Sequence, residues 1–233
     1  MLQPSRIAPL ALAACVALAL ASPAFAGKNV DRVFGSITAE AGEEYGSLDS
    51  VNGSITIRDG AKVRSADTVN GSIRIGSKAD VGSAETVNGG IRVGDGARVR
   101  VVETVNGGIR IDDGAEIERD VEAVNGSIEL GSKAQVGGDI ENVNGRIELD
   151  DARVGGDVAT TNGDITLRKG SVIAGDLRVH KPQGWWFNGN SSKPRVTLEA
   201  GSEVKGNLVL DREVELVIEP GAKHGAIRGE AAP

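Results

Sequence analysis

The segment Val51-Asn52-Gly53-Ser54-Ile55 is one copy of a short motif that the chain repeats at a nearly fixed interval. Further copies with the pattern Val-Asn-Gly-x-Ile begin at Val69, Val87, Val105, Val124 and Val143, and a seventh copy begins with Thr161. Successive asparagines of the motif are about 18 to 19 residues apart, and a short fixed period of this kind is typical of a solenoid. In a solenoid each repeat stacks on the previous one.

The residues around each copy alternate between apolar and polar positions, which is the period of a β-strand. Isoleucine recurs three residues after each asparagine, as at Ile55, and an aliphatic residue recurs five residues after it, as at Ile57. A helical repeat would need about 34 residues and a 3.6-residue period, and neither is present. The sequence therefore predicts an all-β, single-stranded parallel β-helix (β-solenoid) over residues 27–233, with about ten three-sided coils of about 18–19 residues.

The composition agrees with a narrow and repetitive core. Aromatic residues make up only 3% of the chain, whereas glycine occurs 33 times. Small aliphatic side chains in stacked columns can fill such a coil, and glycine can form its corners. The formal net charge of −7 argues against nucleic acid as a partner, because binding to phosphates needs clustered Lys and Arg.

Residues 1–26 have the features of a secretory signal peptide. Arg6 supplies the positive start, residues 7–21 are apolar apart from a proline, and Ala24-Phe25-Ala26 is a small-residue cleavage site. We therefore expect export to the periplasm, the cell surface or the medium, with no transmembrane span in the mature chain. The alternative is lipidation at the cysteine of Leu12-Ala13-Ala14-Cys15, which resembles a lipobox.

The Asn-Gly pair of the motif has a structural explanation. Glycine and asparagine tolerate the positive φ that a sharp corner often requires. Stacked asparagine amides can also hydrogen-bond along a column. The sequence predicts a structural corner ladder of seven residues: Asn52, Asn70, Asn88, Asn106, Asn125, Asn144 and Asn162.

A carboxylate precedes each corner valine by two residues, and stacking would place these carboxylates in one column. They are Asp49, Asp67, Glu85, Glu103, Glu122 and Glu141. At the strand spacing of about 4.8 Å, neighbouring carboxylates repel each other by about 0.8 kcal/mol in water. The first interpretation is a solvated acidic face. The alternative hypothesis is a weak Ca²⁺-binding ladder or a docking surface for a basic partner, and we expect no other cofactor or metal.

An insertion at residues 180–192 interrupts the repeat and contains Trp185, Trp186 and Phe187. One interpretation is a flap that packs on the side of the rod. The other is a contact for a protein or a glycan, because exposed aromatic residues anchor interfaces.

The sequence contains no recognisable catalytic constellation. Asp112-Asp113 and Asp150-Asp151 are adjacent pairs, but neighbours on a strand point to opposite faces and at a turn they act as polar caps. No Gly-x-Ser-x-Gly elbow is present, and His180 and His224 are isolated in the sequence. We expect that the protein is not an enzyme. A carbohydrate-binding or carbohydrate-active β-helix protein is the alternative.

The tandem Val-Asn-Gly-x-Ile coils behind a signal peptide resemble the bacterial putative-adhesin β-solenoid family, which carries head or auto-transporter-adhesin-like repeats. The coils that begin at Leu198 and Ile218 are similar to those of bactofilins, the polymer-forming bacterial scaffold proteins, although bactofilins are generally cytoplasmic. The resemblance implies a right-handed coil and a structural, adhesive or scaffolding role in the cell envelope. The implied partner is an envelope protein, a glycan or a second copy, because uncapped coils invite end-to-end stacking.

Overall fold

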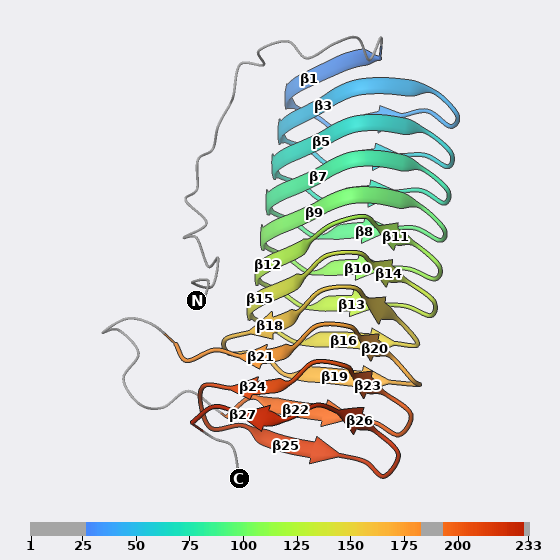
Figure 1. The fold of residues 1–233 in the computed structure, drawn as a ribbon. Helices are drawn as coiled ribbons and strands as arrows, with labels where there is room; N and C mark the ends of the chain where they lie inside the picture. The colour runs from blue at the N-terminus through green and yellow to red at the C-terminus, as the bar shows by residue number, and fades with distance from the viewer. Residues whose placement is uncertain (1–26, 183–192, 231–233) are drawn as a thin grey trace, which may run out of the picture.

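A computed structural model describes residues 27–182 and 193–230 of the chain. This part is a parallel β-solenoid of about 11 turns without a helix, slightly longer than the predicted ten coils. The turns stack along one axis, so that the N-terminal and C-terminal turns lie at opposite ends of a rod (Figure 1). The predicted all-β parallel β-helix is therefore confirmed. Because the described residues form no helix, none of them forms a helix that could cross a membrane.

One side of the rod is a ten-stranded sheet to which each turn contributes one short strand. Its strands are β2 (Ile37–Ala39), β4 (Ile55–Ile57), β6 (Ile73–Ile75), β8 (Ile91–Val93), β10 (Ile109–Ile111), β13 (Ile128–Leu130), β16 (Ile147–Asp150), β19 (Ile165–Arg168), β22 (Arg195–Leu198) and β25 (Glu215–Ile218). The motif isoleucines stack in register, as Ile109 does between Ile91 and Ile128. Alternation then buries the first and third residue of most of these strands and turns the second outward.

The other two sides form one 17-stranded sheet, in which single long strands run along both sides in the first turns. These strands are β1 (Lys28–Phe34), β3 (Glu44–Asn52), β5 (Lys62–Asn70), β7 (Asp80–Asn88) and β9 (Arg98–Asn106). In later turns two short strands replace each long one: β11 (Glu116–Ile117) and β12 (Val121–Asn125), β14 (Gln135–Val136) and β15 (Ile140–Asn144), β17 (Arg153–Val154) and β18 (Val158–Thr160), β20 (Val172–Ile173) and β21 (Leu177–Val179), β23 (Glu203–Val204) and β24 (Leu208–Leu210), β26 (Lys223–His224) and β27 (Ile227–Arg228).

The change from one long strand to two short strands follows from one extra residue. Arg98 of β9 pairs with Glu116, whereas Val102 pairs with Val121, so the second pair is one position further apart along the chain. The additional residue must lie between these two points, at residues 118–120, where the chain leaves the strand conformation. This residue lengthens the coil relative to the coils before it.

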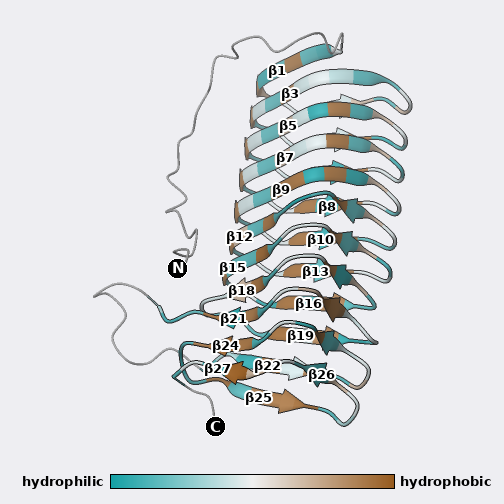
Figure 2. Cartoon of the chain, viewed as in Figure 1, coloured by the Kyte–Doolittle hydropathy of each residue, from teal (hydrophilic) through white to brown (hydrophobic). Residues whose placement is uncertain are grey.

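The core consists of aliphatic columns that run the length of the rod. Ile109, Ile147 and Leu198 are fully buried, and alanines such as Ala97 fill the narrow positions beside the turns. Figure 2 shows hydrophobic residues on the short strands in turn after turn, for example on β10 and β16. Tyr45 is the one aromatic residue buried among those described. The low aromatic content therefore reflects a core too narrow for large rings.

Candidate functional site

A column of carboxylates runs along the 17-stranded sheet, with one member in each turn. Glu103 pairs in register with Glu85 in the previous turn and with Glu122 in the next. The same register brings all six sequence-predicted carboxylates together and adds Asp31 at one end, while Ala159 follows the last member at the other. We call this column the acid ladder: Asp31, Asp49, Asp67, Glu85, Glu103, Glu122 and Glu141.

Most of the acid ladder is half-buried: only Asp31 and Glu85 among its members are exposed. Burial, followed by the charges of Glu85 and Asp49, raises the pKa of Asp67 to about 7. Burial, followed by the charges of Glu85 and Glu122, also raises the pKa of Glu103 to about 7. Burial first and a neighbouring acid second raise the pKa of Asp49, Glu122 and Glu141, the last to about 7. The ladder is therefore a set of carboxyl groups that disfavour one another's ionisation.

A second carboxylate column lies beside the C-terminal end of the acid ladder, and the sequence analysis did not identify it. The Oδ1 atom of Asp157 accepts a hydrogen bond from the backbone N–H of Asp176 at 2.7 Å. We call this column the aspartate column: Asp120, Asp139, Asp157 and Asp176, whose Oδ1 atoms each accept the backbone N–H of the next turn at 2.7–2.9 Å. Its sequence signal is the Gly-Asp pair that recurs at Asp139, Asp157 and Asp176.

The glycine of each Gly-Asp pair is required by close approach between turns. A Cβ atom at Gly156 would lie 2.0 Å from the Oδ1 of Asp139, and one at Gly175 would lie 2.2 Å from the Oδ1 of Asp157. The aspartate column is thus built into the backbone packing. Arg178 also contacts it, with Nη2 at 2.7 Å from Oδ2 of Asp176.

The seven motif asparagines form a continuous hydrogen-bonded column at the corner. Asn106 Nδ2 donates to Asn88 Oδ1 at 3.0 Å, and every other neighbouring pair has the same contact at 2.9–3.0 Å. At its C-terminal end, Asn162 Oδ1 accepts a hydrogen bond from Arg212 Nη1 at 2.9 Å. These contacts join successive turns at their exposed corner and give the asparagines a structural role. The positive φ expected for the Asn-Gly pairs is wrong for all of these asparagines and, among the glycines that follow them, is found only at Gly145.

A buried hydroxyl column supports the same corner from inside the rod, and the sequence analysis did not identify it. The Oγ1 atoms of Thr68, Thr86 and Thr104 each donate to a glycine carbonyl oxygen of the preceding turn at 2.9 Å. Asn142 takes this role further along and donates from Nδ2 to the carbonyl oxygen of Gly126 at 2.8 Å. The threonine before each Val-Asn-Gly could have revealed this column in three coils.

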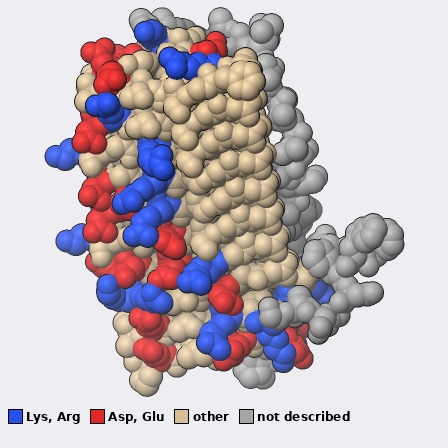
Figure 3. Space-filling view, turned by 180° about the vertical axis from the view of Figure 1, so that it is seen from behind, with Lys and Arg blue, Asp and Glu red and all other residues tan. Residues whose placement is uncertain are grey.

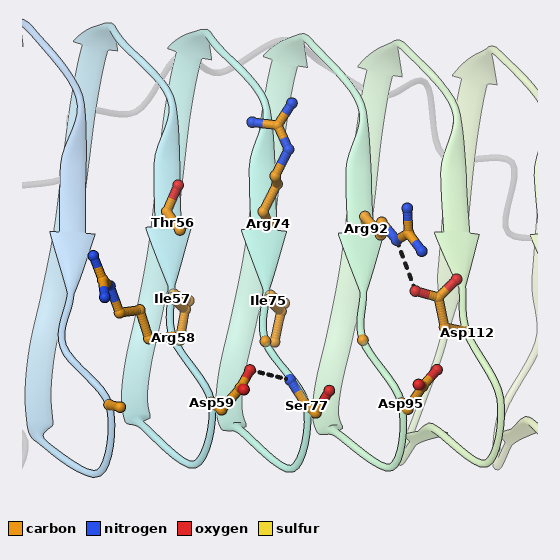
Figure 4. A pocket seen from close by; sticks show the side chains of 13 residues that line it. Thr56, Ile57, Arg58, Asp59, Arg74, Ile75, Ser77, Arg92, Asp95 and Asp112 are labelled. Atoms are coloured by element: carbon orange, nitrogen blue, oxygen red, sulfur yellow. Dashed lines mark hydrogen bonds and ion pairs between the residues drawn. The ribbon is translucent and has the colours of Figure 1, made fainter.

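An open groove of about 620 Å³ runs across the outer face of β4, β6 and β8 (Figure 4). Arg74, Arg92 and Arg110 stack in register along this face. One carboxylate contacts two of them, because Asp112 lies 2.7 Å from Nε of Arg92 and 3.1 Å from Nε of Arg110, and Arg110 also pairs with Glu129 at 2.8 Å. None of the described residues that line the groove is aromatic.

The charged residues are unevenly spread over the surface. Figure 3 shows Lys and Arg in a stripe along one side of a broad face that carries little charge.

The two residues of the pair Asp112-Asp113 have different partners. Asp112 pairs with arginines, whereas Asp113 Oδ1 accepts the backbone N–H of Ser132 at 2.9 Å. The hydrogen bond of Asp113 to a backbone N–H agrees with the polar cap expected for this pair at a turn.

Several sequence-predicted features gain no structural support. Within residues 27–182 and 193–230, no group of three or more His, Cys, Asp or Glu is arranged to hold a metal ion. Trp185, Trp186 and Phe187 lie outside the described residues, as do the proposed signal peptide and Cys15. Their interpretations stay predictions.

Comparisons with protein-family models, with curated proteins and with solved structures found no match to this chain. The fold is compatible with a β-helix repeat family.

Proposed function

We propose that this protein is an exported, non-enzymatic scaffold of the bacterial cell envelope whose rods stack end to end. The observation that carries the proposal is the incomplete burial of the last turn. Leu216 and Ile218 of β25 continue the columns of Val196 and Leu198, which are fully buried in the turn above. In the last turn the same column positions are only partly buried.

The last turn also leaves strand edges without partners in the described structure. β25 pairs with β22, and β27 pairs with β24, but neither has a strand on its other side among residues 27–182 and 193–230. Unpaired N–H and C=O groups on such an edge favour the addition of another strand. Another rod would supply these hydrogen bonds and would complete the burial of Leu216 and Ile218. Because both are already partly buried, each contributes less than the about 1.5–3 kcal/mol of a side chain that goes from exposed to fully buried.

The first turn offers a matching end. β1 pairs with β3 alone among the described strands, and Val33 and Phe34 at its end are 61% and 78% exposed. Cleavage after Ala26, as the sequence predicts, would make β1 the first element of the mature chain. Contact between a C-terminal turn and an N-terminal turn is heterologous, and such contacts continue into filaments when they do not close into a ring.

The cellular part of the proposal rests on the sequence. The signal-peptide features support export, and the resemblance to putative adhesins and bactofilins supports a structural or adhesive role. The alternative of a carbohydrate-binding or carbohydrate-active protein has less support, because neither described groove is lined by an aromatic residue. N-terminal sequencing of the exported protein would distinguish cleavage after Ala26 from lipidation at Cys15.

The assembly is tested by light scattering and electron microscopy of the purified exported protein over a range of concentrations. We expect rods that lengthen with concentration. The double variant Leu216→Lys/Ile218→Lys places two charges on the exposed end and should remain monomeric. The matched control Val51→Lys/Val69→Lys adds the same charges to the side of the rod, where both valines are exposed, and should assemble like the wild type.

A wild-type protein that stays monomeric at every concentration contradicts end-to-end assembly. The same holds if the control variant loses assembly as fully as the end variant. Far-UV circular dichroism of each variant establishes that its β-structure is intact.

A further inference from the structure

The acid ladder and the aspartate column are neighbours, yet they differ in their hydrogen-bond donors. Asp157 accepts a backbone N–H and pairs with the guanidinium of Arg178 at 3.2 Å. Among the described residues, no backbone N–H and no basic side chain donates to any ladder carboxylate from Asp49 to Glu141. Two carboxyls in the N-terminal half have a serine within reach, Ser47 beside Asp49 and Ser65 beside Asp67.

The charged groups that raise the pKa of Asp67, Glu103, Glu122 and Glu141 are all carboxylates. Asp120, Asp139 and Asp157 of the aspartate column lie beside Glu122 and Glu141 and add negative charge. The first basic residue in the ladder's own column is Arg178, which follows Ala159 and is held by the aspartate column. Among the described residues, no ion pair offsets the repulsion between ladder members from Asp49 to Glu141, and each member lies one strand spacing, about 4.8 Å, from the next.

A proton shared between two neighbouring carboxyl groups of the ladder would replace their repulsion by a hydrogen bond. Two carboxylates can only accept hydrogen bonds, but a carboxyl group beside a carboxylate donates O–H to it in a short, charge-assisted bond. Paired carboxylates at other protein sites share a proton for the same reason. Asp49 pairs in register with Asp31 of the previous turn and Asp67 of the next, so these carboxyl groups are stacked neighbours.

We propose that the acid ladder is a proton-operated clamp. Carboxyl groups of adjacent turns share protons and hold together the part of the rod between β1 and β15, and ionisation of the ladder loosens these turns. In a solenoid, stability is the sum of the turns and their nearest-neighbour interfaces. The clamp therefore acts on the turns that carry ladder residues and leaves those from β18 onward unaffected, because Ala159 ends the ladder there.

The direction of the pH effect follows from proton linkage. Burial and like charge raise the pKa of Asp67, Glu103 and Glu141 from the ordinary carboxyl range to about 7. The folded protein therefore binds more protons than the unfolded chain between about pH 4 and about pH 7. The stabilisation is therefore complete below about pH 4, declines across this window and is lost once the pH has risen through about 7.

The test compares the thermal-unfolding midpoint of the exported protein at about pH 5.5 and about pH 8.5. We expect the thermal-unfolding midpoint of the wild type to be lower at the higher pH than at the lower pH. The variant Asp67→Asn/Glu103→Gln/Glu141→Gln replaces three ladder carboxyls by uncharged groups of similar shape. The decrease in midpoint between the two pH values should be at most half as large in this variant as in the wild type. At the higher pH the midpoint of the variant should be higher than that of the wild type.

The matched control is Glu43→Gln/Asp80→Asn/Glu118→Gln, which removes the same three charges from exposed positions outside the ladder. It should keep the wild-type pH dependence. Infrared spectroscopy supplies a readout that does not depend on unfolding: absorption of protonated carboxyl groups should persist in the wild type at neutral pH and should weaken in the ladder variant. If the ladder triple variant does not fold, Glu103→Gln alone should show the same effects at a smaller size.

Two outcomes contradict the clamp. One is a wild-type midpoint that is constant or rises between the two pH values. The other is a control variant that flattens the pH dependence as much as the ladder variant does.

Discussion

Asn106 donates from its side-chain Nδ2 to the Oδ1 of Asn88 at 3.0 Å, and this contact joins two consecutive turns at their exposed corner. Asn106 Oδ1 in turn accepts from Asn125 at 2.9 Å. Each amide in the middle of the column thus uses one donor and one acceptor to hold both neighbours. Because one amide contacts the asparagine of the previous turn and that of the next, its substitution removes two hydrogen bonds.

The variant Asn106→Ala should destabilise the protein by about 1–3 kcal/mol, since each hydrogen bond contributes about 0.5–1.5 kcal/mol. The end of the column offers a matched comparison. Asn52 has an asparagine partner on one side, Asn70, so Asn52→Ala should cost about half as much. Chemical denaturation measures both, and equal losses for the two variants would count against an additive column.

The glycine that follows each asparagine is predicted to be intolerant of any side chain. A Cβ atom at Gly107 would lie 2.0 Å from the backbone oxygen of Gly89, which cannot move without displacing the turn above. We expect Gly107→Ala to cost about 3 kcal/mol or more, at the upper end for overpacking, measured as a shift in the denaturation midpoint.

Gly60 is the control for this prediction, because its φ is +66° but nothing lies within 4 Å of the place that a Cβ atom would take. Lys78 occupies the corresponding place in the next turn with φ +57°, so a side chain fits there. Gly60→Ala should therefore cost only the left-handed strain of about 1–2 kcal/mol. A larger loss for Gly60→Ala than for Gly107→Ala would contradict the close approach assigned to Gly107, whose φ is not positive.

The columns could be predicted from the sequence where the same residue type recurs at the same distance from the motif. The asparagines and the acid ladder satisfy this condition in six or more turns, and the structure stacks both. The aspartate column satisfies it in only three turns, where Asp120, Asp139 and Asp157 each precede a motif asparagine by five residues, because the column begins only after the extra residue at 118–120 has lengthened the coil.

The long strands could not be predicted for a related reason. Apolar alternation indicates which residues of β9 point inward, but it contains no information on whether the backbone hydrogen bonds continue from one side of the coil to the next. That continuity depends on the backbone angles at the bend between the two sides. It ends where β11 and β12 replace the single strand.

The aspartate column predicts a difference between two substitutions at one position. Asp157→Ala leaves the backbone N–H of Asp176 without its acceptor and should cost about 1–3 kcal/mol. Asp157→Asn keeps an oxygen that can accept this N–H, as a side-chain carbonyl does in neutral amides, and loses only the partly exposed contact with Arg178. Denaturation of both variants should place Asp157→Asn closer to the wild type, and the reverse order would contradict the assigned hydrogen bond.

The acid ladder also predicts how salt changes stability. Raising the salt concentration from about 0.01 M to about 1 M shortens the screening length from about 30 Å to about 3 Å, which weakens repulsion between exposed and half-buried carboxylates. Above about pH 8 the ladder is ionised, so added NaCl should raise the unfolding midpoint of the wild type. At about pH 5 the shared protons already remove most of the repulsion, and the same salt should have a smaller effect.

The variant Glu103→Gln assigns this salt response to the ladder itself. The substitution interrupts the column between Glu85 and Glu122, so that the two remaining carboxylates lie two strand spacings apart, about 10 Å. Because repulsion falls with distance, the response of the variant to salt at high pH should be smaller than that of the wild type. If salt stabilises the wild type and Glu103→Gln equally at high pH, the repulsion does not originate in the ladder.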